Sequence, residues 1–154
     1  MLNAWAAAKQ WLLFSQSNTD PKRTPQFFQF VSTWIGFNAL YSTDRKRGNP
    51  EPIVVSQFAF EQLERHHLHL LESDQEYIQA LEYLQIRPVK NMRTGKPVEI
   101  TDRKDIRQVA DCLYAVRCNL FHGDKDPGEL RDQTVVDRAS VVLSHLLTAY
   151  LGSR

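Results

Sequence analysis

Apolar residues recur every three or four positions from Asp102 to Gly123, a stretch that reads DRKDIRQVADCLYAVRCNLFHG. This spacing predicts a helix with one apolar face packed inward, and that face is formed by Ile106, Val109, Ala110, Leu113, Val116 and Leu120. Arg117 falls on the same face. Because a guanidinium cannot shed its charge, its position there indicates a polar partner inside the protein or on a neighbouring molecule.

The end of this helix brings a histidine near Arg117 in the sequence. His122 follows five residues later, and Gly123 is typical of the residue that ends a helix. On an ideal helix Arg117 and His122 differ by roughly 140°, so they share a face only if the last turn loosens. The segment 126–129, DPGE, predicts the cap and first turn of another long helix. The pair is therefore expected at a corner between two helices.

Helical patterns also cover most of the remaining chain. They predict a first helix over 2–16, a second from Pro25, a third after Pro50, a short fourth whose capping box is Ser73 and Glu76, and a last helix over 127–151. Strand-like alternation is essentially absent. The prediction is an all-α antiparallel bundle of five to six helices. With 154 residues, of which 42% are hydrophobic, we expect a single domain over 1–154.

The second helix is apolar nearly all round and is expected in the centre of the bundle. Asn38 and Tyr41 lie on its aromatic stripe. A buried amide needs a hydrogen-bond partner, so Asn38 is predicted to hold a backbone group or a polar neighbour such as Arg117 or His122. A purely structural tie between helices is an equally good interpretation.

The segment 87–97, RPVKNMRTGKP, carries four basic residues and no acidic one. Its prolines and glycine exclude a stable helix, so we expect an exposed basic loop or small hairpin near 87–100. Such an element can bind a phosphate backbone, while the plainer interpretation is a solvated insertion. The candidate substrate-binding residues are Arg87, Lys90, Arg93 and Lys96.

Composition and the remaining motifs narrow the function classes. The histidines of the segment 65–69, RHHLH, lack the spacing that gathers imidazoles on one metal, and are expected on the surface. No metal or cofactor is predicted. Cys112 and Cys118 are expected to be thiols in a reducing compartment. No run approaches the roughly 20 apolar residues of a membrane span, and no signal peptide is recognisable, so we expect a cytoplasmic protein. The net charge of +1 does not decide for or against nucleic acid.

Two short segments resemble a known superfamily. The segment 117–123, RCNLFHG, is similar to the Arg-x4-His motif of HEPN domains, especially the Apea-like and RiboL-PSP-like branch that ends its helix in Asn-Leu-Phe-His-Gly. The segment 34–41, WIGFNALY, resembles the second-helix signature of the same group, in the expected order and at the expected distance. One departure is Cys118, where many members carry a polar residue.

The resemblance implies a metal-independent RNA endonuclease, in a defence or toxin-antitoxin context. Arg117 and His122 would be its catalytic residues, in a composite site at the interface of a homodimer, with Asn119, Asn38 and Tyr41 in support. The side-chain chemistry agrees, because histidine transfers protons near neutral pH and arginine binds phosphate oxygens. Attack of an RNA 2′-hydroxyl on its own phosphate, which leaves a 2′,3′-cyclic phosphate, uses both. Asn119 would orient the phosphate or the histidine, or cap the helix end.

The alternative is a non-catalytic HEPN-like dimerisation module that binds a regulatory protein, such as an antitoxin or a nucleotidyltransferase. Arg117 would then reach a carboxylate such as Asp111 or Asp126, and His122 would bond the last carbonyls of its helix. The two hypotheses differ in exposure. A catalytic pair must be open to solvent in a basic cleft, whereas a structural pair would be sealed by packing or by an internal salt bridge.

Overall fold

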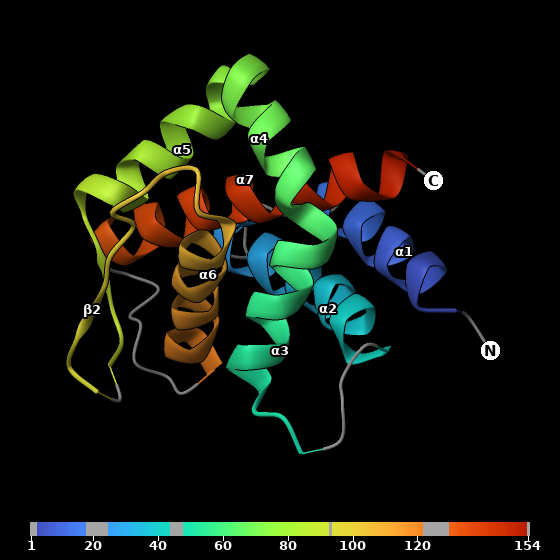
Figure 1. The fold of residues 1–154 in the computed structure, drawn as a ribbon, viewed down its shortest axis with the longest axis horizontal. Coiled ribbons are helices and arrows are strands. Elements are labelled where there is room, and N and C mark those ends of the chain that lie inside the picture. Colours follow the sequence, from blue (N-terminus) through green and yellow to red (C-terminus); the bar gives the residue numbers. More distant parts are fainter. Residues whose placement is uncertain (1–2, 18–24, 44–47, 93, 122–129, 154) are drawn as a thin grey trace.

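The computed structural model of the chain describes residues 3–17, 25–43, 48–92, 94–121 and 130–153. The helices are α1 (Ala4–Ser17), α2 (Pro25–Thr43), α3 (Glu51–Phe58), the π-helical turn η1 (Ala59–Leu63), α4 (Glu64–Ser73), α5 (Gln75–Ile86), α6 (Ile106–Phe121) and α7 (Leu130–Gly152). Because α3, η1 and α4 follow one another without a break, the described part forms six helices (Figure 1). The predicted all-α bundle is confirmed.

The core of the bundle is built on α2 and α7. Trp34 of α2 is 2% exposed, and its ring stacks on that of Phe30, with the two ring centres 5.9 Å apart. It also packs edge-to-face with the rings of Phe37 and Tyr41, at centre-to-centre distances of 5.1 and 6.1 Å. α7 faces this cluster with buried aliphatic side chains at Val136, Ala139, Val142, Leu143, Leu146 and Leu147. The prediction that the second helix is central is therefore correct for its inner face.

The opposite side of α2 reaches solvent, and the predicted burial of Asn38 is wrong. Asn38 is exposed, and its Oδ1 accepts a hydrogen bond of 3.3 Å from the Ser42 hydroxyl. The buried side of α2 is centred on Phe37 and Tyr41, and an ideal helix turns Asn38 about 100° away from Phe37. Because α2 has apolar residues on nearly every side, the sequence pattern did not show that the side with Asn38 faces solvent.

The junction between α4 and α5 differs from the predicted capping box. Ser73 still belongs to α4, and its hydroxyl donates to the carbonyl of His69 at 2.9 Å. Asp74 caps α5 instead, since its Oδ1 accepts the backbone N–H of Tyr77 at 3.0 Å. This hydrogen bond is the largest cause that lowers the pKa of Asp74.

The predicted exposure of the histidine cluster is wrong for His67, which is fully buried. Its Nε2 lies 2.8 Å from the carbonyl oxygen of Arg103, which can only accept, so Nε2 carries the proton. Nδ1 then accepts from the hydroxyl of Tyr77 at 2.6 Å. Within the ranges that the structure covers, no three His, Cys, Asp or Glu side chains come together as metal ligands.

We expect the free energy of unfolding to fall as the pH drops below about 6.5, the pKa of an unperturbed histidine. Burial lowers the pKa of His67, so the unfolded chain binds a proton more readily than the folded protein. The contribution of neutral His67 to the free energy of unfolding is complete above pH 6.5 and is lost toward lower pH. Urea unfolding at pH 7.5 and 5.5 measures this. The difference in free energy of unfolding between the two pH values should be smaller in His67→Gln and should remain in the control His69→Gln. An equal difference in wild type and both variants would contradict the role of His67.

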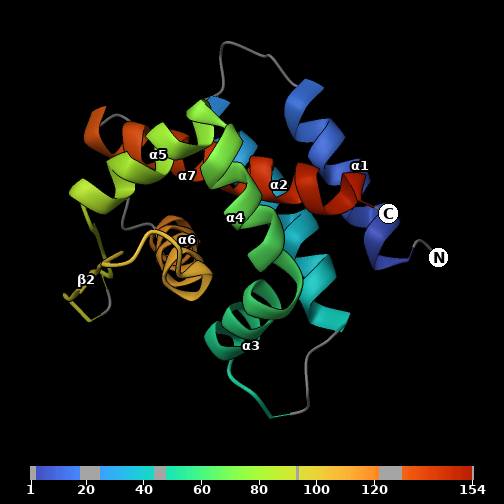
Figure 2. The same ribbon diagram turned by 45° about the horizontal axis from the view of Figure 1, so that its top comes forward.

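The basic segment forms a small hairpin, as one of the two predicted forms. β1 (Val89–Lys90) pairs antiparallel with β2 (Pro97–Val98), with Val89 opposite Val98. α6 lies between this hairpin and α3 in both ribbon views (Figures 1 and 2).

Among the helices that the structure describes, none combines the length and apolar character of a membrane span.

Candidate functional site

The helix that carries Arg117, α6, begins at Ile106, four residues later than the stretch from Asp102 given by the sequence pattern. Asp105 starts it by accepting the backbone N–H of Arg107 at 3.0 Å. The inward face of α6 is buried at Ile106, Val109, Ala110, Leu113 and Val116, and Leu120 is half-buried. The C-terminal part of this helix presents Arg117 toward α3.

Arg117 is held by a carboxylate and two aromatic rings. Its Nη2 lies 3.6 Å from Oε1 of Glu51, the first residue of α3, and its side chain is 23% exposed. Its Cζ lies 4.8 Å from the ring centre of Phe121 and 5.6 Å from that of Tyr114. These contacts restrict the orientation of the guanidinium while leaving part of it open to solvent.

Glu51 also binds the second helix. The hydroxyl of Tyr41 donates to Oε1 of Glu51 at 2.6 Å. Burial, and secondly this hydrogen bond, raise the pKa of Tyr41, so its hydroxyl keeps its proton and remains a donor. One carboxylate oxygen therefore joins α2, α3 and α6 through Tyr41 and Arg117.

The charge of Arg117 is secure. Burial alone would lower the pKa of its guanidinium, but the contact with Cys118 and the charge of Glu51 outweigh burial, and the pKa is raised. Burial, followed by Cys118 and Glu51, raises the pKa of Tyr114 to about 12. At neutral pH the site therefore contains a permanent cation beside a neutral phenol.

The guanidinium is only weakly satisfied by hydrogen bonds. Nη1 donates to the Sγ of Cys118 at 3.8 Å, and thiols are weak acceptors. The contact with Glu51 is longer than the usual 2.7–3.2 Å of an N–H···O hydrogen bond. The Nε atom is buried and has no acceptor among the described residues. Within the described chain, Arg117 thus retains donor capacity at its Nη atoms.

Glu51 is the member of the Arg117 cluster that the sequence patterns did not indicate. The carboxylates considered as partners of Arg117 were Asp111, which is exposed on α6, and Asp126, which lies outside the described residues. The only local signal at Glu51 is an acidic residue in the first turn of a helix, which is common. Its contact with Arg117 depends on how α3 packs against α6.

Asn119 does not accompany Arg117, because its amide is bound to the hairpin. The side chain is 1% exposed, and its Nδ2 donates to the carbonyl of Lys90 at 2.8 Å. Its Oδ1 accepts the backbone N–H of Met92 at 3.2 Å. Both ends of the amide are therefore used away from Glu51, and Asn119 does not cap its own helix.

The predicted site residues are thus brought together only in part. Tyr41 meets Arg117 through Glu51, whereas Asn38 bonds Ser42 on the outer face of α2. Arg87, Lys90 and Lys96 are exposed along the hairpin and its base. His122 and Arg93 lie outside the described residues.

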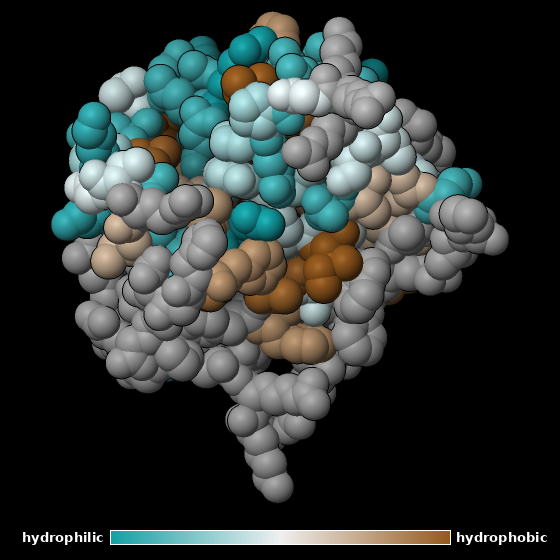
Figure 3. Space-filling model, turned by 90° about the horizontal axis from the view of Figure 1, so that it is seen from below, coloured by the Kyte–Doolittle hydropathy of each residue, from teal (hydrophilic) through white to brown (hydrophobic). Residues whose placement is uncertain are grey.

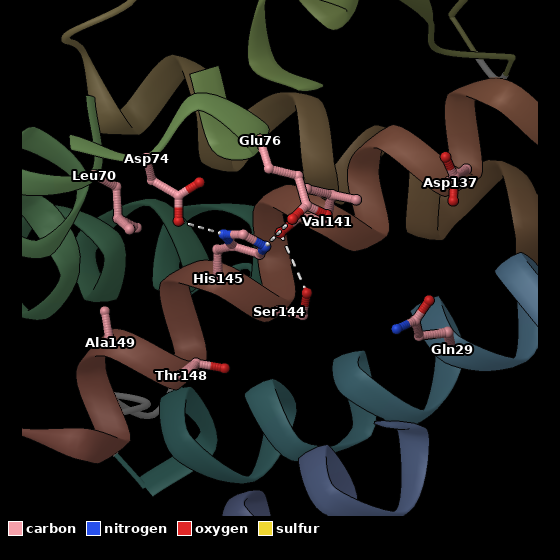
Figure 4. Close-up of a pocket in the computed structure, with 10 residues that line it drawn as sticks. All are labelled: Gln29, Leu70, Asp74, Glu76, Asp137, Val141, Ser144, His145, Thr148 and Ala149. Carbon is pink, nitrogen blue, oxygen red and sulfur yellow. Dashed lines mark hydrogen bonds and ion pairs between the residues drawn. The ribbon is translucent and has the colours of Figure 1, made fainter. Parts of the chain in front are cut away.

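A hollow of about 590 Å³ lies elsewhere, between α2, α4, α5 and α7. Figure 4 shows His145 at its centre, with Nδ1 2.9 Å from Oδ2 of Asp74 and Nε2 3.7 Å from Oε2 of Glu76. These groups are paired with one another, and none of the predicted site residues lines the hollow. The hollow therefore adds no group to the Arg117 cluster.

Comparisons with protein-family models, with curated proteins and with solved structures gave no match for this chain. The similarity to HEPN domains accordingly rests on the two sequence motifs alone.

Proposed function

We propose that the protein is a metal-independent RNA endonuclease of the HEPN type, in which Arg117 and His122 act on one phosphate. The observation that carries the proposal is the guanidinium of Arg117. It is oriented by Glu51 and two rings, partly exposed, and left without a short hydrogen bond among the described residues. Such a cation is suited to receive phosphate oxygens.

In the proposed reaction the 2′-oxygen of a ribose attacks the adjacent phosphorus. The O2′–P bond forms and the P–O5′ bond breaks, which gives a 2′,3′-cyclic phosphate and a free 5′-hydroxyl. A base takes the proton of the 2′-hydroxyl and an acid gives one to the leaving 5′-oxygen, the two roles that a histidine can perform. Arg117 stabilises the charge that builds on the non-bridging oxygens.

A homodimer would supply the second histidine. An exposed apolar side chain beside the cluster supports such an interface, since Phe121, 48% exposed, lies against the guanidinium of Arg117. Ile35, on the outward face of α2, is also exposed, at 38%. Figure 3 shows a hydrophobic patch in the middle of the face seen from below. Arginine and aromatic residues are enriched where protein surfaces meet.

The proposed setting is the cytoplasm, in a defence or toxin-antitoxin context. Cys112 and Cys118 are free and buried, which suits a reducing compartment. Burial raises the pKa of Cys112 to about 12, so this thiol is an inert part of the core. A ribonuclease of this kind would be neutralised by a protein antitoxin.

A second candidate function is a non-catalytic dimerisation module that binds a regulatory partner, such as a nucleotidyltransferase. The observation that favours it is the ion pair between Arg117 and Glu51, since an internal carboxylate can satisfy an arginine that has no substrate. The two candidates share the fold and the proposed dimer and differ in what Arg117 binds.

The deciding experiment is incubation of the protein with labelled single-stranded RNA in EDTA, followed by analysis of the product ends. We expect wild type to leave 2′,3′-cyclic phosphate ends and His122→Ala, purified identically, to leave the RNA intact. Equal cleavage by both proteins would identify a contaminant and overturn the proposal. Absence of cleavage on several unrelated RNAs would favour the binding module.

A further inference from the structure

We propose that the β1–β2 hairpin, together with Arg87 and Arg138 at its base, is a docking surface for the phosphate backbone of single-stranded RNA, and that Asn119 is the residue that holds it in position. The choice of RNA among polyanions rests on the proposed ribonuclease function. The surface itself is argued from the contacts that fix the hairpin and from the charges that it displays.

The hairpin is too small to be stable alone. Each strand has two residues, and an isolated two-stranded hairpin is marginal in water. Its strands are anchored by the buried side chain of Val89 and, just beyond β2, by that of Ile100, each 3% exposed. Within the turn, the N–H of Asn91 donates to the carbonyl of Lys96 at 2.9 Å, and Gly95 adopts a φ of 71°.

Asn119 completes this anchoring from α6. Both ends of its buried amide bond the backbone of the hairpin, at Lys90 and at Met92. A buried amide without hydrogen-bond partners costs about 1–3 kcal/mol. A shift of the hairpin along α6 would break both bonds and incur this cost, so the bonds favour the observed position of the hairpin on the helix. The backbone at Lys90 and Met92 is thus tied to the helix that also carries Arg117.

The fixed turn is cationic. Between residues 87 and 98 the sequence has no acidic residue, and Lys90 and Lys96 are both exposed. At the base of the hairpin, Cζ of Arg87 lies 5.3 Å from the ring centre of Tyr83, and Cζ of Arg138 lies 5.6 Å from the same ring. Two guanidinium groups therefore gather at one ring, and only Arg138 has a nearby carboxylate, Asp137 at 3.7 Å, among the described ion pairs.

The surface also has a useful position relative to Arg117. The hairpin lies on one side of α6, and α3, which carries Glu51, lies on the other (Figure 2). A strand of RNA that passes over the C-terminal end of α6 would meet both. Since the C-terminus of a helix carries partial negative charge, it disfavours a nearby anion, and the positive charges of the hairpin lysines and Arg117 would offset this effect.

The composition of the surface indicates backbone contacts, not base reading. The segment 87–98 contains no aromatic side chain for stacking, and its exposed polar groups are mainly lysine and arginine. Phosphate contacts carry no sequence information and are weakened by salt. Binding through this surface should therefore tolerate any sequence and decrease steeply with ionic strength.

The test is fluorescence anisotropy with a labelled single-stranded RNA of mixed sequence, in EDTA, at several salt concentrations. All proteins carry His122→Ala so that the probe stays intact. Replacing both Lys90 and Lys96 with glutamine should weaken binding at least about tenfold at low salt and reduce the slope of log K against log salt by about 1.4, or 0.7 for each lost phosphate contact. The control replaces Arg65 and Lys104, exposed outside the hairpin, with glutamine and should bind like its parent.

Asn119→Ala tests the anchor without changing the charge. It should weaken binding while circular dichroism shows the helices intact; if it fails to fold, the lysine variant decides alone. Equal affinity of the lysine variant and its control would overturn the proposal, as would poly-glutamate competing as well as RNA. Lysine-dependent binding in the His122→Ala background, with no RNA cleavage by wild type, would uphold this surface and reject the ribonuclease. RNA cleavage by wild type, with equal affinity of the lysine variant and its control, would do the reverse.

Discussion

Arg117→Ala is expected to slow RNA cleavage by about a hundred- to a thousandfold, the usual cost of removing one group that stabilises developing charge. Arg117 is the fixed cation of the proposed site, since its guanidinium stays charged beside Glu51. Single-turnover cleavage rates in EDTA measure the effect. Thermal unfolding should change little, because a partly exposed ion pair contributes about 0–1 kcal/mol.

Glu51→Gln is the matched comparison for this variant. The amide oxygen can still accept the hydroxyl of Tyr41, but the charge that orients Arg117 is lost. If Glu51 only positions Arg117, Glu51→Gln should cut RNA faster than Arg117→Ala does. The double variant should then be no slower than Arg117→Ala alone. Unchanged cleavage in Arg117→Ala would contradict the assignment of Arg117 and leave the pair with a structural role.

Trp34→Ala is expected to lower the free energy of unfolding by about 3–5 kcal/mol, the range for truncating a buried tryptophan. The side chain is 2% exposed and contacts the rings of Phe30, Phe37, Tyr41 and Tyr114. The free energy of unfolding of a single domain is only about 5–15 kcal/mol, so this loss would leave the protein close to unfolding. Urea denaturation followed by circular dichroism gives the value.

Two further variants make the result specific to the aromatic cluster. Trp34→Phe keeps a ring in the same place and should cost clearly less than alanine. Leu68→Ala removes an apolar side chain of α4 that is 37% exposed and should change stability only slightly. A loss at Trp34 no larger than that at Leu68 would mean that the cluster does not organise the core.

Local patterns predicted the elements of this fold well and their partners poorly. The three- and four-residue spacing of apolar residues identified α6 and its buried face, because a helix repeats every 3.6 residues whatever surrounds it. The same spacing could not distinguish the inner from the outer side of α2, which is why Asn38 was misplaced. The cap of α5 was missed by one residue, since Ser73 and Asp74 are both good caps.

By itself the sequence determined the all-α class, the order of the helices, a basic loop or hairpin near 87–100 and the motif that contains Arg117. Only the tertiary structure decided that Glu51 faces Arg117, that His67 is buried between Tyr77 and Arg103, and that Asn119 binds the hairpin. The physical reason is the range of the interactions. Helix formation depends on neighbours within one or two turns, whereas each of these contacts joins separate elements and exists only once they have packed.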